Sequence, residues 1–278
     1  MRPPGKPVPE KMDSRDAVLD AAAVELLADV LQEQSGMVLP PHRPAVLHAL
    51  LGPVARNFGL RDVEAIVAAL RQGNGAMRRA VAEALATGSS TFFRDPDGLA
   101  CLLAHLLSGG RTARRIRIWC AACAAGQEAY SIAMLLEEAG LSGHMREIVA
   151  TDFSTTMSAR AEAALYSADE MAGMSEPRRT AYFTRDADHW RVRKSLRQGV
   201  RFTAHNLLGS APGATDCDAV LCCNLLIYFD ASATATALDR IAESLVPGGL
   251  LLLGRGEKLR DHDGAFEGIA PNLYRRST

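Results

Sequence analysis

The sequence has no apolar run long enough to span a membrane and no excess of either charge. Its formal net charge of −1 provides no general attraction to nucleic acid or to an anionic membrane, so we expect neither nucleic-acid binding nor membrane insertion. The first residues are rich in proline and poor in apolar side chains. This composition predicts a flexible tail over 1–13 and not a signal peptide.

The sequence also lacks the spacing of a metal site. Cys120 and Cys123 form a C-x-x-C pair, but no second pair and no paired histidines follow at zinc-ligand distances. The six cysteines lie mostly inside apolar segments, where reduced thiols pack as small hydrophobic side chains. We therefore expect no metal and a reducing, cytoplasmic location.

A length of 278 residues, 48% of them hydrophobic and 23% charged, is sufficient for two ordinary globular domains. From 14 to 87 the apolar residues recur with a helical period, which predicts an all-helical N-terminal domain. Its helices are expected over about 18–35, 44–58, 62–70 and 76–86.

From residue 88 to residue 278 the pattern changes. After a helix over about 96–107, strands are expected at 116–120, 147–151, 200–203, 219–223, 250–254 and 273–276, and helices at 127–138, 154–164 and 232–245. Such alternation predicts a mainly parallel, doubly wound α/β sheet. Aromatic stretches on either side of a polar loop at 184–189 predict a small β subdomain inserted at about 166–199.

The expected strand 219–223 leads into Asn224 and, a few residues later, Tyr228 and Asp230. In open α/β sheets ligands bind at the carboxyl ends of the strands. These polar side chains therefore mark a candidate ligand edge.

Two acidic residues indicate what this edge binds. Glu128 opens a helix after a turn of small residues that has one glycine, Gly126, and no dinucleotide fingerprint; it would attract an ammonium or sulfonium group, or it could simply favour the helix start. Asp152 follows 26 positions after Gly126, a spacing suited to ribose hydroxyls, although it could also cap the next helix. Together they favour adenosine with a cationic tail, hence S-adenosylmethionine over NAD.

Six ordered segments resemble motifs of the chemotaxis receptor methyltransferases (CheR family). The segment TGSSTFFRD at 87–95 is similar to the family's T-N-x-T-x-F-F-R, and WCAACAAGQEAYS at 119–131 is similar to W-S-A-A-x-S-T-G-E-E-P-Y-S. The others are ATD, NLL, CCNLLIYFD and PGG, at 150–152, 206–208, 222–230 and 247–249. A late GRGE at 254–257 stands where the family has G-H-S-E, and the resemblance extends from the N-terminal helices to 272–274.

The resemblance implies a Rossmann-like, S-adenosylmethionine-dependent methyltransferase fold that releases S-adenosylhomocysteine. It implies that Arg94 and Tyr228 contact the methyl-transfer centre and act in catalysis. The residues that it assigns to the cofactor are Gly88, Ser90, Arg94, Glu128, Asp152, Asn206, Leu207, Cys222, Cys223 and Asn224.

The resemblance also implies the substrate. The family methylates glutamate side chains on the cytoplasmic helices of chemoreceptors, giving methyl esters, and its inserted β subdomain contacts the receptor. In some members the subdomain also grips a pentapeptide tether at the receptor's end. The short, glycine-free loop at 184–189 looks like the pentapeptide-independent type, and we expect a monomer.

Several positions depart from the family pattern. Gly88 replaces an Asn, Ser90 a Thr, Gln127 a Glu, Cys223 an Arg and Arg255 a His. Each lost polar contact costs cofactor binding on the order of 1 kcal/mol. Two alternatives therefore stay open: a non-catalytic relative that binds receptors or a regulator, and a methyltransferase for another acceptor.

Overall fold

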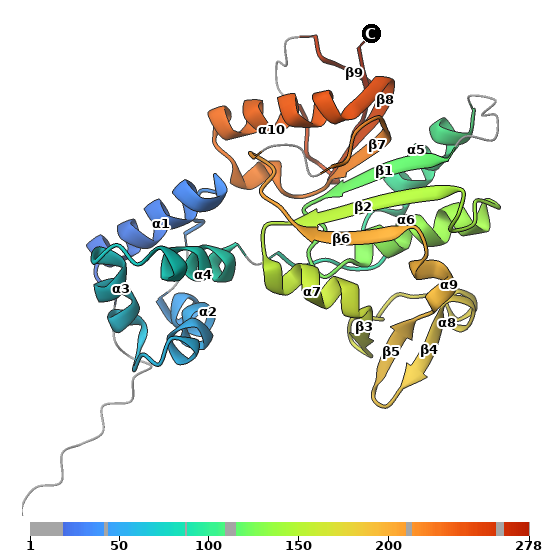
Figure 1. Ribbon diagram of the computed structural model, residues 1–278. Coiled ribbons are helices and arrows are strands. Elements are labelled where there is room, and N and C mark those ends of the chain that lie inside the picture. Colours follow the sequence, from blue (N-terminus) through green and yellow to red (C-terminus); the bar gives the residue numbers. More distant parts are fainter. Residues whose placement is uncertain are drawn as a thin grey trace, which may run out of the picture. The chain divides into compact units, whose positions relative to one another are not determined.

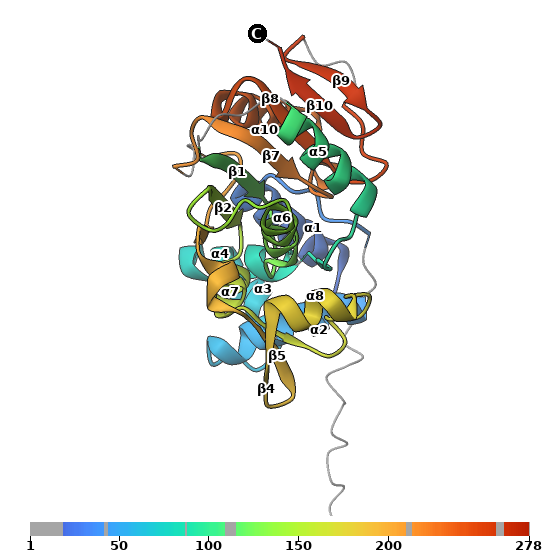
Figure 2. The same cartoon turned by 90° about the vertical axis from the view of Figure 1, so that its right-hand side faces the viewer.

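The computed structural model describes residues 19–41, 44–86, 88–108, 115–209, 213–259 and 264–277 (Figures 1 and 2). The tail expected over 1–13 and the start of the expected helical domain lie outside these residues. The chain forms two compact units. Residues 39–85 and the segment ending at Gln34 form a helical unit, while Ser35–Val38 and the segment from Ala86 onward form the other.

The described part of the helical unit contains four helices, in agreement with the helical period of the sequence. They are α1 (Ala21–Ser35), α2 (Pro44–Asn57), α3 (Val63–Arg71) and α4 (Gly75–Leu85). Asp62 caps α3 by accepting a hydrogen bond from the Ala65 amide at 2.9 Å, as expected for an N-cap aspartate. Apolar side chains from all four helices are buried, among them Leu27, Leu51, Ile66 and Val81.

The second unit is built on a seven-stranded sheet in the order β6-β2-β1-β7-β8-β10-β9. The strands are β1 (Ile116–Ala121), β2 (Arg146–Asp152), β6 (Val200–Ala204), β7 (Cys217–Cys222), β8 (Leu245–Leu253), β9 (Phe266–Ala270) and β10 (Leu273–Arg276). The first five are parallel, and β10 runs antiparallel to β8 and β9. The doubly wound α/β sheet expected from the sequence is confirmed.

Helices cover both faces of this sheet (Figure 1). On one face α5 (Pro96–Ser108) and α6 (Gln127–Glu138) pack on Ile118 and Cys120 of β1; on the other α10 (Ala231–Ser244) packs with Trp119 and Ala121. The alternation of side chains along a strand explains this division. A further helix, α7 (Thr155–Ala163), follows β2. The order of the strands reverses at β1, which is followed by β2 and β6 on one side and by β7 and β8 on the other, and such a switch point creates a crevice at the carboxyl ends of β1 and β7.

Two features of the sheet differ from the expectation. Strand β8 begins at Leu245, so the Pro247-Gly248-Gly249 segment lies inside it and not before it. The segment loops out of the ladder, because Cys217 pairs with Leu245 while Ala219 already pairs with Leu250. The edge strand β9 was not expected at all; Gly268 and a mostly exposed surface give it little strand pattern.

The insertion is a three-stranded antiparallel sheet in the order β3-β5-β4. Its strands are β3 (Leu165–Ser167), β5 (His189–Val192) and β4 (Phe183–Asp186), accompanied by α8 (Glu176–Tyr182) and α9 (Lys194–Arg197). The β element is present, but it begins one residue earlier than 166. The polar loop expected over 184–189 is wrong, because β4 and β5 extend into it and leave a turn of only 187–188.

No helix in the described part of the chain is long and apolar enough to cross a membrane.

Candidate active site

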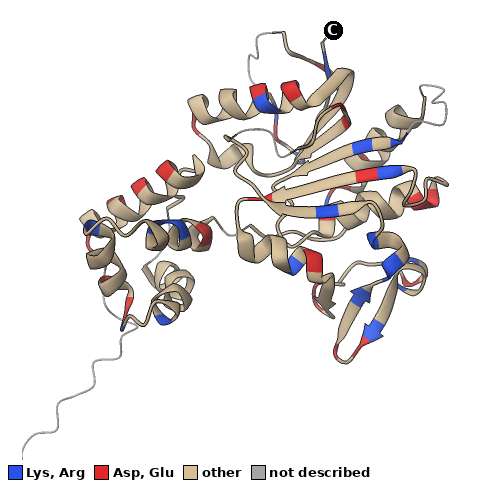
Figure 3. Ribbon diagram, in the orientation of Figure 1, with Lys and Arg blue, Asp and Glu red and all other residues tan. Residues whose placement is uncertain are grey.

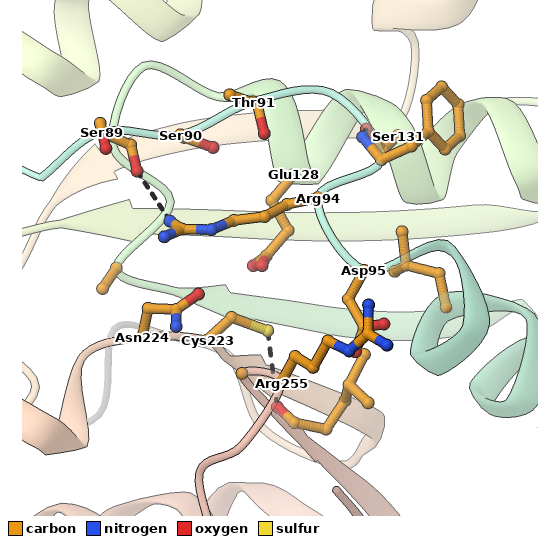
Figure 4. Close-up of a pocket in the computed structure, with 15 residues that line it drawn as sticks. Ser89, Ser90, Thr91, Arg94, Asp95, Glu128, Ser131, Cys223, Asn224 and Arg255 are labelled. Atoms are coloured by element: carbon orange, nitrogen blue, oxygen red, sulfur yellow. Dashed lines mark hydrogen bonds between the residues drawn. The ribbon is translucent and has the colours of Figure 1, made fainter. Parts of the chain in front are cut away.

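A cavity of about 260 Å³ lies at the carboxyl ends of β1, β7 and β8, beside the start of α6 (Figure 4). Five of the residues expected from the sequence line it: Ser90, Arg94, Glu128, Cys223 and Asn224. Its wall also includes Ser89, Thr91, Asp95, Ser131, Gly254 and Arg255, which the sequence did not single out as site residues. The structure therefore brings five of the eleven predicted site residues together in one place.

The turn between β1 and α6 is built for close packing. Ala122, Ala124 and Gly126 all have positive φ angles, of 67°, 45° and 89°. A Cβ atom on Gly126 would lie 2.8 Å from the Cβ of Ala161 and 3.1 Å from the ring of Phe202, so only glycine fits. This tight turn presents the first turn of α6 to the cavity.

Glu128 is the most unusual side chain of the cavity. Its Oε1 atom is buried and has no hydrogen-bond partner among the described residues. Burial raises the pKa of Glu128 to about 7, while the Cys223 thiol and Arg94 beside it act in the opposite direction. A buried carboxylate oxygen without a hydrogen-bond donor is costly, and a bound cation that donates to it removes this cost. The pocket therefore fits the ammonium of an amino-acid tail.

Arg94 reaches across the cavity from the segment that precedes α5 (Figure 4). Its Nη1 donates a hydrogen bond to the carbonyl of Ser89 at 3.0 Å. The two phenylalanines before it anchor the segment: Phe92 is buried edge-on against Tyr166, with ring centroids 4.9 Å apart, and the Phe93 amide donates to the Ser131 hydroxyl. Arg94 itself stays exposed and offers further donors to an anion.

At the end of β7 the chain changes from core to site. Cys222 is fully buried in the sheet core, while Cys223 faces the cavity. Burial, and in Cys223 also the neighbouring Glu128 carboxylate, raises the pKa of both thiols well above the usual range. Both cysteines therefore remain neutral packing groups, and among the described residues no cluster of His, Cys, Asp or Glu could hold a metal ion.

Glu257 supports this strand end and was missed as a functional residue. Its buried Oε2 atom accepts hydrogen bonds from the amides of Asn224, at 2.8 Å, and Gly254, at 2.7 Å. The carboxylate thus joins the ends of β7 and β8 and holds Asn224 at a φ of 59°. A Cβ on Gly254 would lie 2.6 Å from Glu257, which explains the glycine. The GRGE segment was the available sequence signal.

Asp152 lies at the same edge of the sheet, at the end of β2, but it does not line the cavity. Its Oδ2 atom accepts from the amide of Ala124 at 2.8 Å and its Oδ1 atom from that of Ser154 at 2.9 Å. Ser154, not Asp152, is the N-cap of α7. The helix-cap interpretation of Asp152 is therefore wrong, and its side chain instead holds the β1–α6 turn.

The remaining predicted residues also lie outside the cavity wall. Asn206 follows β6 and accepts a hydrogen bond from the Leu208 amide, while Leu207 packs in the core below α10. Tyr228 is half-buried in the short 3-10 helix Leu226–Tyr228 after β7. Gly88 is exposed, with open space around its Cα. Their assignment to the cofactor or to catalysis stays a prediction.

A doubly wound sheet whose crevice holds a buried carboxylate oxygen without a partner fits the class of S-adenosylmethionine-dependent methyltransferases. The family model "CheR methyltransferase, SAM binding domain" matches residues 88–274, and the chain belongs to this family. The resemblance, the enzyme class and the cofactor expected from the sequence are thereby confirmed.

Curated relatives match along most of their length. Chemotaxis protein methyltransferase 1 of Pseudomonas aeruginosa is 33% identical over 253 residues, which cover 86% of this chain and 91% of the relative. Chemotaxis protein methyltransferase Cher2 of Pseudomonas putida is 32% identical over 240 residues, covering 82% and 87%. The chemotaxis protein methyltransferase of Salmonella typhimurium is 30% identical over 256 residues, covering 89% and 87%.

Proposed function

We propose that this enzyme transfers a methyl group from S-adenosylmethionine to glutamate side chains on the cytoplasmic helices of chemoreceptors, forming methyl esters during sensory adaptation. The names of its relatives support chemotaxis as the process. The observation that carries the proposal is the pair formed by a buried, unsatisfied Glu128 and an exposed Arg94 in one cavity. The first suits the cationic tail of the cofactor and the second an anionic acceptor.

The residues that hold the cofactor lie along the carboxyl edge of the sheet. Glu128 binds the ammonium of the methionine tail, and Asp152 accepts hydrogen bonds from the ribose. We assign the adenine and methionine pocket to the segments 206–207 and 222–224, and we assign Gly88 and Ser90 to contacts with the cofactor. When bound, S-adenosylmethionine supplies an electrophilic methyl group on a positively charged sulfur.

The protein's task in the transfer is alignment. A substrate glutamate is already ionised at neutral pH, since its reference pKa is about 4.3, so no general base is required. Arg94 orients this carboxylate through its planar donors, in line with the methyl carbon and sulfur. Tyr228 contacts the transfer centre from the turn after β7. Removal of water from the nucleophile accelerates the attack further.

Receptor recognition is assigned to the other parts of the chain. We assign 14–87 to a helical domain and 88–278 to the methyltransferase domain, whose insertion contacts the receptor. Basic residues on β4, β5 and α9 support this assignment (Figure 3): Arg185, Arg191, Lys194 and Arg197. The two-residue turn between β4 and β5 supports recognition without a pentapeptide tether. The enzyme acts as a cytoplasmic monomer in this proposal.

Transfer of radiolabel from S-adenosylmethionine to receptor-containing membranes tests the proposal. The expected product is labelled receptor whose label is released by mild base, because a glutamate methyl ester is base-labile. Base-stable label, or label on another protein only, would replace the receptor glutamate by a different acceptor. Calorimetry with S-adenosylhomocysteine separates the non-catalytic alternative, since a pure binding protein would give no heat of binding.

A further inference from the structure

Four residues between two segments of the helical unit belong to the methyltransferase unit. They are Ser35–Val38, hereafter the strap. Met37 forms an antiparallel bridge with Phe229, and the Val38 amide donates a hydrogen bond to the carbonyl of Tyr228 at 2.7 Å. The strap therefore contacts the turn that carries Tyr228 through main-chain bonds, not through side chains alone.

Gly36 allows the strap to run close to the cofactor edge. Its φ of +78° is a left-handed conformation, and a Cβ there would lie 2.1 Å from the Cδ1 atom of Leu208 and 3.6 Å from the Cβ of Ala233. Leu208 directly follows the predicted cofactor residues 206–207. A side chain at this position would displace the Leu208 side chain and would strain the left-handed backbone, so both effects favour glycine.

The hydrogen bonds of the turn after β7 show what the strap contributes. The turn begins at Asn224, held by Glu257, and ends at Asp230, which caps α10 by accepting from the Ala233 amide at 2.8 Å. Between them, the amides of Tyr228 and Phe229 donate only within the turn, to Leu225 and Leu226. In the described part of the chain, the Tyr228 carbonyl is bonded to the strap alone. The middle of the turn is thus fixed from outside by Val38.

We propose that the strap is a positioning element of the methyl-transfer centre: its hydrogen bond to Tyr228 and its β-bridge with Phe229 fix the peptide of Tyr228 and thereby orient the tyrosine side chain. The proposal rests on the role proposed above for Tyr228. It has a physical basis in the sensitivity of transfer reactions to alignment, since a misplacement of about 1 Å can lower a rate about 100-fold. Val38 is a positioning residue and contacts no reacting group.

The substitution Val38→Pro removes the N–H donor with little loss of packing, because the Val38 side chain is 47% exposed. We expect kcat to fall about 10-fold or more, while the Kd for S-adenosylhomocysteine changes less than about 3-fold. Leu39→Pro is the matched control. It places the same ring one residue later, where the N–H has no hydrogen-bond partner among the described residues, and we expect unchanged kcat.

A double-mutant cycle with Tyr228→Phe separates positioning from general loss of structure. If the strap acts through the tyrosine hydroxyl, Val38→Pro has little further effect on kcat in the Tyr228→Phe background. Fold-changes that multiply, or a Val38→Pro enzyme with wild-type kcat, would overturn the proposal. A Tyr228→Phe enzyme with wild-type kcat would overturn it as well, because the strap would then have no catalytic target.

A spectroscopic measurement makes the test independent of the proposed function. The protein has five tyrosines, so fluorotyrosine labelling gives five ¹⁹F resonances, and the Tyr228 resonance is the one missing in Tyr228→Phe. Val38→Pro should shift or broaden this line and Leu39→Pro should leave it in place, even in a protein that methylates no receptor. An unmoved line in Val38→Pro would refute the positioning claim by itself.

A second variant covers a failure of Val38→Pro to fold. Gly36→Ala strains the left-handed backbone of the strap and adds a methyl group against the Leu208 side chain, and we expect the same loss of kcat and the same shift of the Tyr228 resonance. Its control is Gly73→Ala, because Gly73 has a similar φ of +82° but no atom within 4 Å of its missing Cβ. Equal behaviour of the two alanine variants would contradict a role for the strap.

Discussion

Glu128, in the first turn of α6 after β1, and Asp152, at the end of the neighbouring strand β2, have opposite surroundings in the protein. Both oxygens of Asp152 accept backbone amides, those of Ala124 and Ser154. One oxygen of Glu128 is buried without a partner, and the pKa of its carboxyl group is raised to about 7. The first carboxylate is satisfied by the fold, whereas the second waits for a ligand.

This difference teaches how the site is prepared. Asp152 holds the β1–α6 turn in the absence of the cofactor, so its removal should lower both the stability of the fold and the affinity for the cofactor. Burial of the Glu128 carboxylate destabilises the folded protein until a cation binds to it, so its removal should lower the affinity for the cofactor without lowering the stability of the fold. Natural sites often sacrifice stability in this manner. Substitutions at Arg94, Asp152 and Glu128 test this contrast, and the largest effect is expected at Arg94.

Arg94→Ala should lower the rate of methyl transfer and leave cofactor binding, which depends on the two carboxylates, nearly unchanged. We expect kcat to fall on the order of 100- to 1,000-fold, as when one pre-positioned donor is removed from an active site. The affinity for S-adenosylhomocysteine should stay nearly intact at pH 8, where Glu128 is ionised. Arg94→Lys keeps the charge but loses the planar pair of donors and should recover part of the rate. Unchanged turnover in Arg94→Ala would remove Arg94 from the mechanism.

Asp152→Ala should lower two quantities together. The free energy of unfolding should fall by about 2 kcal/mol, because two amides lose a charged acceptor, and the affinity for S-adenosylhomocysteine should fall on the order of 100-fold. Thermal unfolding and calorimetry measure the two effects. Asp188→Ala, in the turn between β4 and β5, is the control and should change neither. Equal affinity in Asp152→Ala would count against the ribose assignment.

Glu128→Gln should change the affinity for S-adenosylhomocysteine and the free energy of unfolding in opposite directions. We expect a loss of roughly 10-fold in affinity at pH 8, the size of one charge-assisted hydrogen bond. The same variant should be more stable than the wild type at pH 8. A carboxyl group whose pKa is raised from 4.5 to about 7 by folding destabilises the folded state increasingly as pH rises through this window. The stability gain should therefore vanish near pH 4.5.

Glu267→Gln, on the exposed edge strand β9, is the matched control for this experiment and should leave affinity and stability unchanged. A Glu128→Gln protein that is less stable than the wild type at pH 8 would contradict the contrast between the two carboxylates.

The parallel sheet could be predicted because its signals are local. Strands such as β7 are apolar throughout, and α6 and α10 follow at the regular spacing of an α/β fold. The bulge at Pro247 and the edge strand β9 could not be predicted, since both depend on which strands pair with each other in the sheet. The same holds for the extra residues of β4 and β5, whose polar side chains look like a loop until they pair.

Site residues could be predicted where a single sequence motif contains both the residue and the side chains that support it. Arg94 and Glu128 lie in motif segments that also carry their own supports, such as Phe92 and Gly126. Glu257 was missed because its hydrogen bonds join the ends of β7 and β8, and the GRGE segment that contains Glu257 does not by itself show that these two strands are neighbours. The bond between Val38 and Tyr228 was missed for the same reason.

The measurement that tests the central claim most directly is the number of protons released when S-adenosylhomocysteine binds at pH 6.5. Calorimetry in buffers of different ionisation enthalpy gives this number. With a pKa of about 7 in the free protein, Glu128 is largely protonated at this pH, and the ligand's ammonium should drive the proton off.

Affinity should accordingly rise as pH increases towards 7 and level off above it. We predict a net release of up to about three-quarters of a proton in the wild type, the protonated fraction at pH 6.5 of a group with a pKa of about 7, and its disappearance in Glu128→Gln. Equal release by the two proteins, or none by the wild type, would show that Glu128 does not bind the cofactor's cation.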